Sequence, residues 1–266
     1  MARRNRQNAN EPQLKFHQKL LLNRYMLGRF GVSNFTELAE ILKNPALEEI
    51  DDEGVTGFYK QISSVLGAKC RVPREKLAEY DLNIVAHLAK INEKRDEPLS
   101  LKYYQYLSLL FVEYYLDNYF NNRQGLLDGL NALASEFNEK FPNDAIELYE
   151  EGDLNKIAIW NATGSGKTLI MHINYHQYKH YSGGKLPDGA TYILLTPKEG
   201  LSLQHIEEFG VSGIPARIYD KSASRWMRSE GEISVLENTK LGEKDQDAIV
   251  SVRRFGNRNV VFVDEG

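Results

Sequence analysis

The chain has 266 residues, of which 42% are hydrophobic and 26% charged, and its formal net charge is −4. This composition is ordinary for a globular protein, and no apolar run approaches the ~18 residues of a membrane-spanning helix. Cys70 is the single cysteine, which excludes an internal disulfide, so a cytoplasmic protein without membrane contact is the default expectation. The slightly acidic balance gives no support for nucleic-acid binding, which usually shows a basic excess.

The first 150 residues are predicted to be helical behind a short polar tail. Residues 1–10 are basic and polar and lack the apolar stretch of a secretory signal, so we expect a flexible tail. Residues 11–150 carry apolar side chains at three- and four-residue spacing, which is typical of amphipathic helices. Helices are predicted at 14–30, 35–43, 57–66, 75–93, 99–120 and 125–141. The segment 99–120 has the broadest apolar face, and we interpret its aromatic residues as core rather than as a binding surface.

Residues 151–266 alternate short β-rich runs with helical runs. Strands are predicted at 156–160, 191–196, 214–219, 233–236 and 259–264, and helices at 167–181, 201–209 and 245–255. Such an alternation favours right-handed crossovers and a parallel sheet. The predicted fold class is therefore α/β, with a parallel sheet preceded by a helical N-terminal region.

A phosphate-binding loop is predicted at 161–168, N-A-T-G-S-G-K-T, between a predicted strand and a predicted helix. Its glycines let the backbone turn so that N–H groups point at phosphate, and the helix start adds its positive dipole end. Lys167 would reach the β- and γ-phosphates of ATP, and the Thr168 hydroxyl would hold Mg²⁺. The strict pattern has glycine where this chain has Asn161. The candidate nucleotide-binding residues are Ala162, Thr163, Gly164, Ser165, Gly166, Lys167 and Thr168.

An apolar run that ends in two acids, V-V-F-V-D-E at 260–265, supplies the carboxylates that such a loop needs. Asp264 is predicted to hold Mg²⁺, and Glu265 to orient or deprotonate the attacking water. Together with Lys167 they are the candidate catalytic residues. A strand leaving the core gives the same pattern, so this prediction depends on its pairing with the phosphate loop.

These motifs resemble those of superfamily 2 helicases and translocases. A-T-G-S-G-K-T at 162–168 is similar to motif I, T-P-K-E-G-L-S-L-Q at 196–204 to motif Ia, and D-E-G at 264–266 to the start of motif II, the DEAD/DEAH box. The helical lead-in and the D-E-G ending are most similar to type III restriction enzyme Res subunits. The resemblance covers about residues 100–266. It implies a RecA-like P-loop ATPase domain over 151–266 that is cut off within motif II, with a second motor domain and a nuclease expected outside the chain.

The resemblance also implies roles for residues away from the phosphate loop. Thr196, Pro197 and Gln204 would contact the nucleic-acid backbone. Gln105, within the Y-Y-Q element at 103–105, would read adenine through its amide, with a plain polar position on a helix as the alternative. Double-stranded DNA is the expected nucleic acid, and a methyltransferase or specificity subunit is a further candidate partner.

Two other groups of residues invite a functional interpretation. A basic and aromatic group could follow a phosphate backbone, although a solvated loop is favoured. It comprises Arg217, Tyr219, Lys221, Arg225, Trp226 and Arg228. His172, His176 and His180 lie four residues apart on one predicted helix, but without an H-E-x-x-H pattern or a carboxylate among them a metal site is not expected.

The function expected from these features is that of a nucleic-acid-dependent ATPase, a DNA translocase or helicase of a restriction or phage-defence system. A repair or RNA helicase has the same chemistry and stays open as an alternative. A switch or assembly subunit that binds ATP without translocating is the alternative from a different class. ATP hydrolysis is expected of the full-length protein, and residues 1–266 alone are expected to turn over slowly because arginines of a second domain would be missing.

Overall fold

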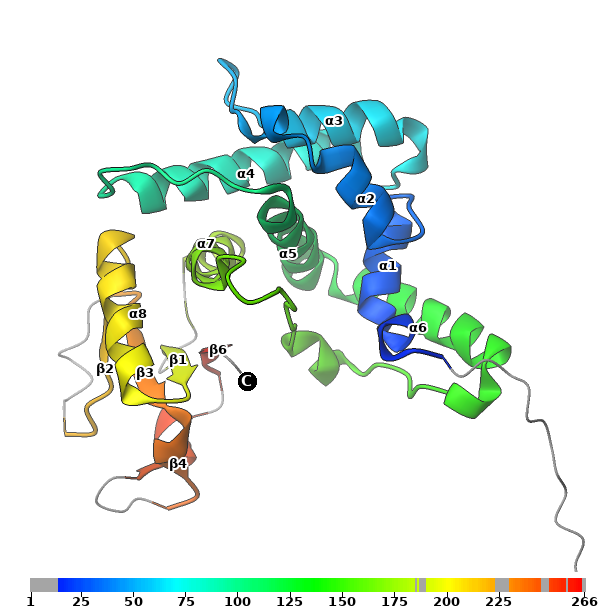
Figure 1. The fold of residues 1–266 in the computed structure, drawn as a ribbon. Helices are drawn as coiled ribbons and strands as arrows, with labels where there is room; N and C mark the ends of the chain where they lie inside the picture. The colour runs from blue at the N-terminus through cyan, green and yellow to red at the C-terminus, as the bar shows by residue number, and fades with distance from the viewer. Residues whose placement is uncertain are drawn as a thin grey trace, which may run out of the picture.

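The structure is a computed structural model that describes residues 14–184, 186, 190–222, 230–244, 249–256 and 258–264. A helical region leads into a sheet region through the phosphate loop and α7 (Figure 1). The α-helices are α1 (Leu21–Arg29), α2 (Phe35–Leu42), α3 (Gly57–Leu66), α4 (Arg74–Asn92), α5 (Tyr103–Asn121), α6 (Arg123–Lys140), α7 (Lys167–Tyr181) and α8 (Glu199–Val211). The strands are β1 (Tyr192–Thr196), β2 (Ala216–Ile218), β3 (Ile233–Glu237), β4 (Leu241–Gly242), β5 (Val250–Ser251) and β6 (Val260–Val263). Among these helices, none combines the length and apolarity needed to cross a bilayer.

The helix α5 is the centre of the helical region. It packs against α4, α6 and α7, so nearly its whole circumference is buried, as its apolar sequence predicts. The helix begins at Tyr103, where the Gln105 Oε1 atom accepts a hydrogen bond from the Lys102 backbone N–H at 2.8 Å and caps the first turn. By contrast, α6 buries a single stripe of apolar residues, which packs towards α1 and α5.

Buried acids join the helices of this region. Asp81 on α4 is fully buried and accepts hydrogen bonds from the Thr56 backbone N–H, the Thr56 hydroxyl and the Tyr106 hydroxyl at 2.8, 2.6 and 2.6 Å. Thr56 in turn caps α3, because its Oγ1 accepts from the Tyr59 backbone N–H. A carboxylate buried with three donors is compensated, and here it fixes α3, α4 and α5 relative to one another.

The sheet region confirms the predicted α/β class. Four parallel strands have the order β2-β3-β1-β6, and a short parallel pair, β4-β5, lies beside them. In register, Tyr192 of β1 lies between Ile233 of β3 and Val260 of β6. Within the described residues, β6 pairs with β1 alone, so its other edge is open.

The two faces of the sheet are covered by different elements. Tyr175 of α7 and Phe209 of α8 pack with Tyr192 and Ile233, so both helices lie on one face. On the opposite face, residues of β5 and the following 3₁₀ helix (Val252–Phe255) cover Ile193 and Leu236. Val261 and Val263, which share the opposite face, stay 47% and 58% exposed.

The predicted strand at 156–160 is wrong for this conformation. The segment has no regular secondary structure and pairs with no strand of the described residues, and Trp160 is 84% exposed. Ile159 packs against the helical core, and Asn161 lies 3.2 Å from the Ser108 hydroxyl of α5. These contacts hold the segment along the helices, so tertiary packing outweighs its β propensity.

Two predicted helices also need correction. The helix predicted at 14–30 is interrupted at Leu20, so that a 3₁₀ turn (Phe16–Lys19) precedes α1. The helix predicted at 245–255 is instead β5 followed by a 3₁₀ turn, with residues 245–248 outside the described range. Val250 pairs with Leu241, and Ser251 Oγ accepts from the Arg253 backbone N–H, which starts a turn. The β-branched residues there favour the extended form.

Candidate nucleotide site

The phosphate loop has the backbone shape that its sequence predicts. Gly164 and Gly166 have φ of +76° and +78°, in the left-handed region that a side chain disfavours. The Ser165 backbone N–H donates to the Ala162 carbonyl at 3.2 Å and closes a turn. The chain therefore reverses immediately before α7, and the loop residues Ala162 and Thr163 are exposed.

The start of α7 is open to an anion. Its N-cap, Gly166, supplies no side-chain cap, and its first turn contains no acidic residue. The first backbone N–H groups of the helix thus lack intrahelical acceptors, and they carry the positive end of the helix dipole. Lys167, the first residue of α7, is half-buried and pairs with no carboxylate within the described residues. Thr168 follows it in the same half-buried turn.

The loop also contains a buried hydroxyl that lacks a hydrogen-bond partner among the described residues. The Ser165 Oγ atom is buried and has no hydrogen-bond partner among the described residues. A buried hydroxyl without a partner costs free energy, which a bound oxyanion would recover. The loop thus combines free donors, a nearby cation and an unpaired hydroxyl, as a phosphate group requires.

Gln105 lies against the phosphate loop. Its Nε2 atom donates to the Ser165 carbonyl at 2.9 Å, while its Oε1 atom accepts from Lys102. The side chain is buried, and a Cβ added to Gly166 would lie 2.4 Å from Nε2. The amide that the sequence assigns to adenine therefore already holds the loop to α5, and adenine recognition by Gln105 stays a prediction.

Asp264 follows β6 at the carboxyl end of the sheet. Its backbone N–H donates to the Leu195 carbonyl at 3.0 Å, and its Oδ2 atom lies 2.9 Å from Nε2 of His205 on α8. The hydrogen bonds described for Asp264 thus lead to β1 and α8, and none of them reaches the phosphate loop. Glu265 lies outside the described residues.

The predicted nucleic-acid contacts differ in accessibility. Thr196 is fully buried, and its hydroxyl lies 2.6 Å from that of Ser202, so its contact with nucleic acid stays a prediction. The hydroxyl joins the end of β1 to α8. Pro197 is half-buried, and Gln204 is exposed on α8.

The predicted basic and aromatic group is only partly described. Arg217 of β2 pairs at 2.6 Å with Glu232, the residue before β3, so its guanidinium is not free to follow a phosphate backbone. Arg225, Trp226 and Arg228 lie outside the described residues.

The histidines of α7 face two different neighbours. His172 Nδ1 lies 2.8 Å from the Ser212 hydroxyl, and its ring stacks on Phe209 of α8. His176 and His180 instead approach the ring of His87 on α4. Across the described part of the chain, no group of three His, Cys, Asp or Glu side chains is placed to hold a metal ion.

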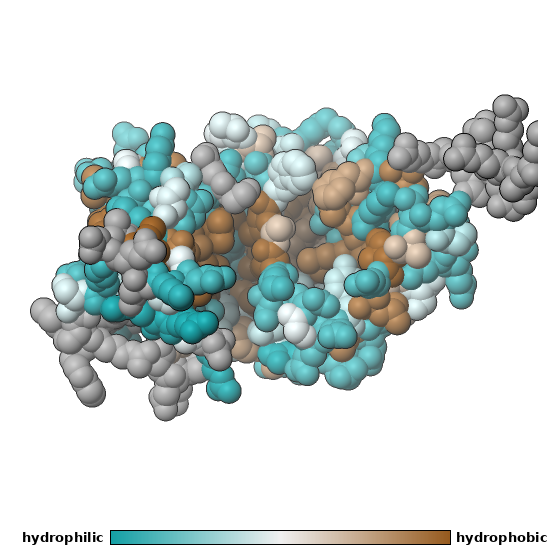
Figure 2. Space-filling model, turned by 90° about the horizontal axis from the view of Figure 1, so that it is seen from below, coloured by the Kyte–Doolittle hydropathy of each residue, from teal (hydrophilic) through white to brown (hydrophobic). Residues whose placement is uncertain are grey.

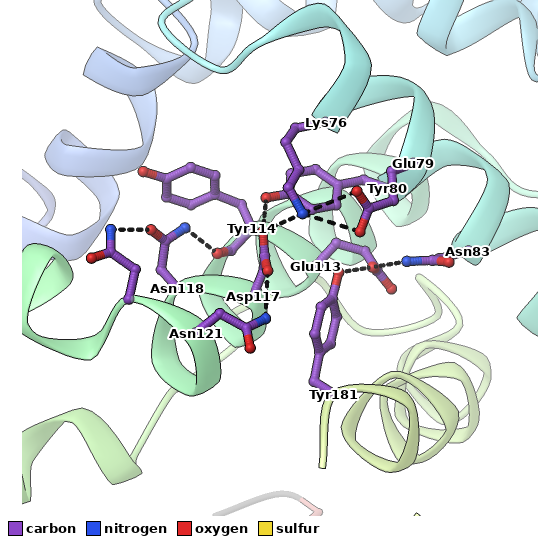
Figure 3. A network of polar contacts seen from close by, with 11 residues as sticks. Lys76, Glu79, Tyr80, Asn83, Glu113, Tyr114, Asp117, Asn118, Asn121 and Tyr181 are labelled. Carbon is purple, nitrogen blue, oxygen red and sulfur yellow. Dashed lines mark hydrogen bonds and ion pairs between the residues drawn. The ribbon is translucent and has the colours of Figure 1, made fainter. Parts of the chain in front are cut away.

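Sequence reasoning missed a polar network where α4, α5 and the end of α7 meet (Figure 3). Glu113 of α5 is fully buried and accepts hydrogen bonds from the Tyr181 hydroxyl at 2.6 Å and from Asn83 at 3.1 Å. Burial raises the pKa of Glu113 to about 7, although these bonds oppose the shift. Burial, with the charge of His176 as a smaller cause, lowers the pKa of His87 to about 3.

A second buried acid in the same network faces α4. Asp117 of α5 accepts from the Tyr80 hydroxyl at 2.6 Å and from Asn121 at 2.8 Å, and it lies 3.2 Å from Lys76 Nζ (Figure 3). An acid within an apolar helical run was the available signal for both residues. The network fixes α7, and with it the phosphate loop, to the helical region.

Comparisons with protein-family models, curated proteins and solved structures found no match for this chain.

Proposed function

We propose that this chain is the ATP-binding part of a nucleic-acid-dependent ATPase of the superfamily 2 helicase and translocase type, built on a RecA-like sheet. One observation carries the proposal: A-T-G-S-G-K-T forms a loop with two left-handed glycines that opens an uncapped helix. The buried, unpaired Ser165 hydroxyl at the same loop supports a phosphate ligand. The parallel sheet with Asp264 at its carboxyl end is the setting in which α/β proteins bind nucleotides.

The residues take distinct roles in this proposal. Backbone N–H groups of the loop and of the first turn of α7 bind the β- and γ-phosphates, and Lys167 neutralises their charge. Thr168 and Asp264 would hold Mg²⁺, which neutralises charge that develops on the phosphates. Glu265 orients the attacking water. Each of these side chains acts by position and charge, since phosphoryl transfer needs little covalent chemistry from the protein.

The handedness of the crossovers indicates how the loop approaches Asp264. The chain passes from β1 over α8 to β2, which lies beyond β3. Since α7 lies on the same face as α8, a right-handed crossover into β1 requires the preceding strand on the opposite side of β1, beyond β6. The segment before α7 is 156–160, and that edge of β6 is open.

We infer that 156–160 pairs with the open edge of β6 when nucleotide binds. Figure 2 shows apolar surface in the hollow between the sheet region, at left, and the helical region, at right. Ile157, Trp160, Val261 and Val263 are exposed apolar residues of the two segments that would pair. Their pairing would bury this surface and bring the phosphate loop to the end of β6, beside Asp264.

Nucleotide affinity tests the proposal. Calorimetry with ATP and Mg²⁺ should show binding to the wild-type chain and a loss of about tenfold or more in Lys167→Ala, because the loop loses its cation. Lys69→Ala, which removes an exposed lysine of the helical region outside the loop and outside 156–160, is the matched control and should bind normally. Equal affinity in wild type and Lys167→Ala would refute the nucleotide site.

Hydrogen exchange tests the inferred pairing. Amides within 157–160 and those of Val261 and Val263, which point to the open edge of β6, should exchange more slowly with Mg²⁺-ATP than without it, because new strand hydrogen bonds protect them. Protection at 164–168 alone would show that ATP binds without the fifth strand.

The proposal that nucleic acid stimulates ATP hydrolysis rests on the resemblance to motifs Ia and II of superfamily 2 helicases. A longer protein that contains this chain should hydrolyse ATP faster with double-stranded DNA than without nucleic acid. Stimulation by RNA alone would favour the RNA helicase alternative, and no stimulation by either would favour the ATP-binding switch.

A further inference from the structure

The carboxylate of Asp264 is held by a buried histidine. The Asp264 Oδ2 atom accepts from Nε2 of His205 at 2.9 Å, and the His205 side chain is 4% exposed. Because a carboxylate accepts only, the bond places a hydrogen on Nε2. The bond links β6 to α8, two elements that are separated by 59 positions in sequence.

The imidazole of His205 is itself fixed in place. Its ring contacts Phe209, one turn further along α8, with centroids 6.3 Å apart. Phe209 is buried and stacks on His172 of α7 at 4.3 Å. The helix α8 is anchored at its start by the Thr196 and Ser202 hydroxyls, 2.6 Å apart. The ring that holds Asp264 therefore belongs to a packed unit of β1, α7 and α8.

This arrangement leaves one carboxylate oxygen for another ligand. A histidine that binds Oδ2 fixes the rotamer of Asp264 and directs Oδ1 away from itself. Partners that orient a metal-binding side chain contribute strongly to metal affinity, and their loss typically costs about 10- to 100-fold. The Nδ1 atom of His205 is buried without a partner among the described residues, so Nε2 is the atom through which the ring acts.

We propose that His205 is a positioning residue that holds Asp264 ready for the metal ion of the metal–nucleotide complex. This inference rests on the proposed ATP function and assigns that site a residue that orients its metal ligand.

Two substitutions at His205 separate positioning from packing. His205→Leu removes the donor but keeps an apolar side chain in the buried site. His205→Gln keeps an N–H donor near the position of Nε2, so it should rescue the wild-type behaviour. His172→Leu is the matched control, because His172 is equally buried against Phe209 but has no bond to Asp264.

The measurement is the affinity of the full chain for a fluorescent ATP analogue, in EDTA and across a Mg²⁺ titration. In His205→Leu the Mg²⁺ concentration for half-maximal effect should rise about 10-fold, with unchanged affinity in EDTA. His205→Gln and His172→Leu should titrate like wild type. Thermal unfolding of each variant shows how far it has lost stability.

The outcomes distinguish this inference from the proposed function. If His205→Leu shows the wild-type Mg²⁺ dependence, or loses affinity equally with and without Mg²⁺, the bond to Asp264 is structural and the inference is overturned. Binding that is lost in Lys167→Ala would still support the proposed function in that case. If the wild-type chain binds no ATP at all, the proposed function fails and this inference fails with it.

Discussion

The phosphate loop lies between two regions that differ in how their side chains are partnered and buried. In the helical region, the buried carboxylate of Asp81 is matched by donors from Thr56 and Tyr106. In the sheet region, Val261 and Val263 are exposed on a strand with an open edge. The helical region therefore holds the loop through buried hydrogen bonds, whereas the sheet region has a strand edge beside Asp264 that pairs with no other described strand.

Removing a buried acid should cause the largest loss of stability. Asp81→Ala leaves two hydroxyls and one backbone N–H without their acceptor, so the free energy of unfolding should fall by about 3 to 5 kcal/mol. Urea unfolding followed by circular dichroism measures the change. Asp52→Ala, at an exposed neighbouring acid, should change it by less than about 0.5 kcal/mol. A small effect of Asp81→Ala would show that the helical region is less tightly built than the hydrogen bonds suggest.

The next largest effect on stability is expected at Glu113, and this effect depends on pH. Its pKa of about 7 in the folded chain lies above the ordinary glutamate value of 4.5, so folding favours the protonated form. The stability that Glu113 contributes is thus present below pH 4.5 and is lost as the pH rises through 7. This loss amounts to at most about 3 kcal/mol.

A comparison of variants isolates the contribution of Glu113. Burial also lowers the pKa of His87 to about 3 and that of His176 to about 4, and these shifts make stability rise with pH in the acid range. Glu113→Gln retains both histidines, so the difference from wild type should favour the variant increasingly between pH 5 and 8. Unfolding curves at several pH values measure it, and a constant difference would contradict the raised pKa.

Gln105 should have an intermediate effect, because it joins the two regions. Gln105→Leu removes the bonds to Lys102 and Ser165, and stability should fall by about 1 to 2 kcal/mol. If the Gln105 amide only holds the phosphate loop in place, the affinities for ATP and for GTP should fall together. If it reads adenine, ATP affinity alone should fall and the preference over GTP should be lost. Binding of both nucleotides, measured side by side, separates these roles.

The smallest effect is expected at the open edge of the sheet. Val261→Thr should change the free energy of unfolding by less than about 0.5 kcal/mol, because this side chain is about half exposed. The same change in the core of this sheet, Val235→Thr on β3, buries a hydroxyl and should cost about 1 to 3 kcal/mol. Equal losses at the two valines would show that the surface around β6 is covered in solution.

Local signals in the sequence predicted most elements near the site. The helix at 167–181 has the predicted bounds, because the glycines before it and the Ser182 to Gly184 turn after it mark both ends. The phosphate loop also has its predicted shape, since two glycines in fixed positions determine its turns.

Contacts between distant residues could not be predicted in this way. Gln105 is recognisable as a polar residue on an apolar helix, but its bond to Ser165 spans 60 positions. The same holds for His205 and Asp264, which no local pattern connects. Thr196 was assigned to nucleic acid by motif alone, and its burial follows from the packing of α8 against β1.

The open edge of β6 also has a consequence for how the protein behaves at high concentration. Strand N–H and C=O groups that pair with no other described strand, beside exposed valines, are a template on which another chain can add a strand. In the absence of nucleotide, the chain should therefore self-associate through this edge as its concentration rises. If 156–160 covers the edge when ATP binds, Mg²⁺-ATP in the buffer should keep the protein dispersed, and the nucleotide would act as a solubility factor.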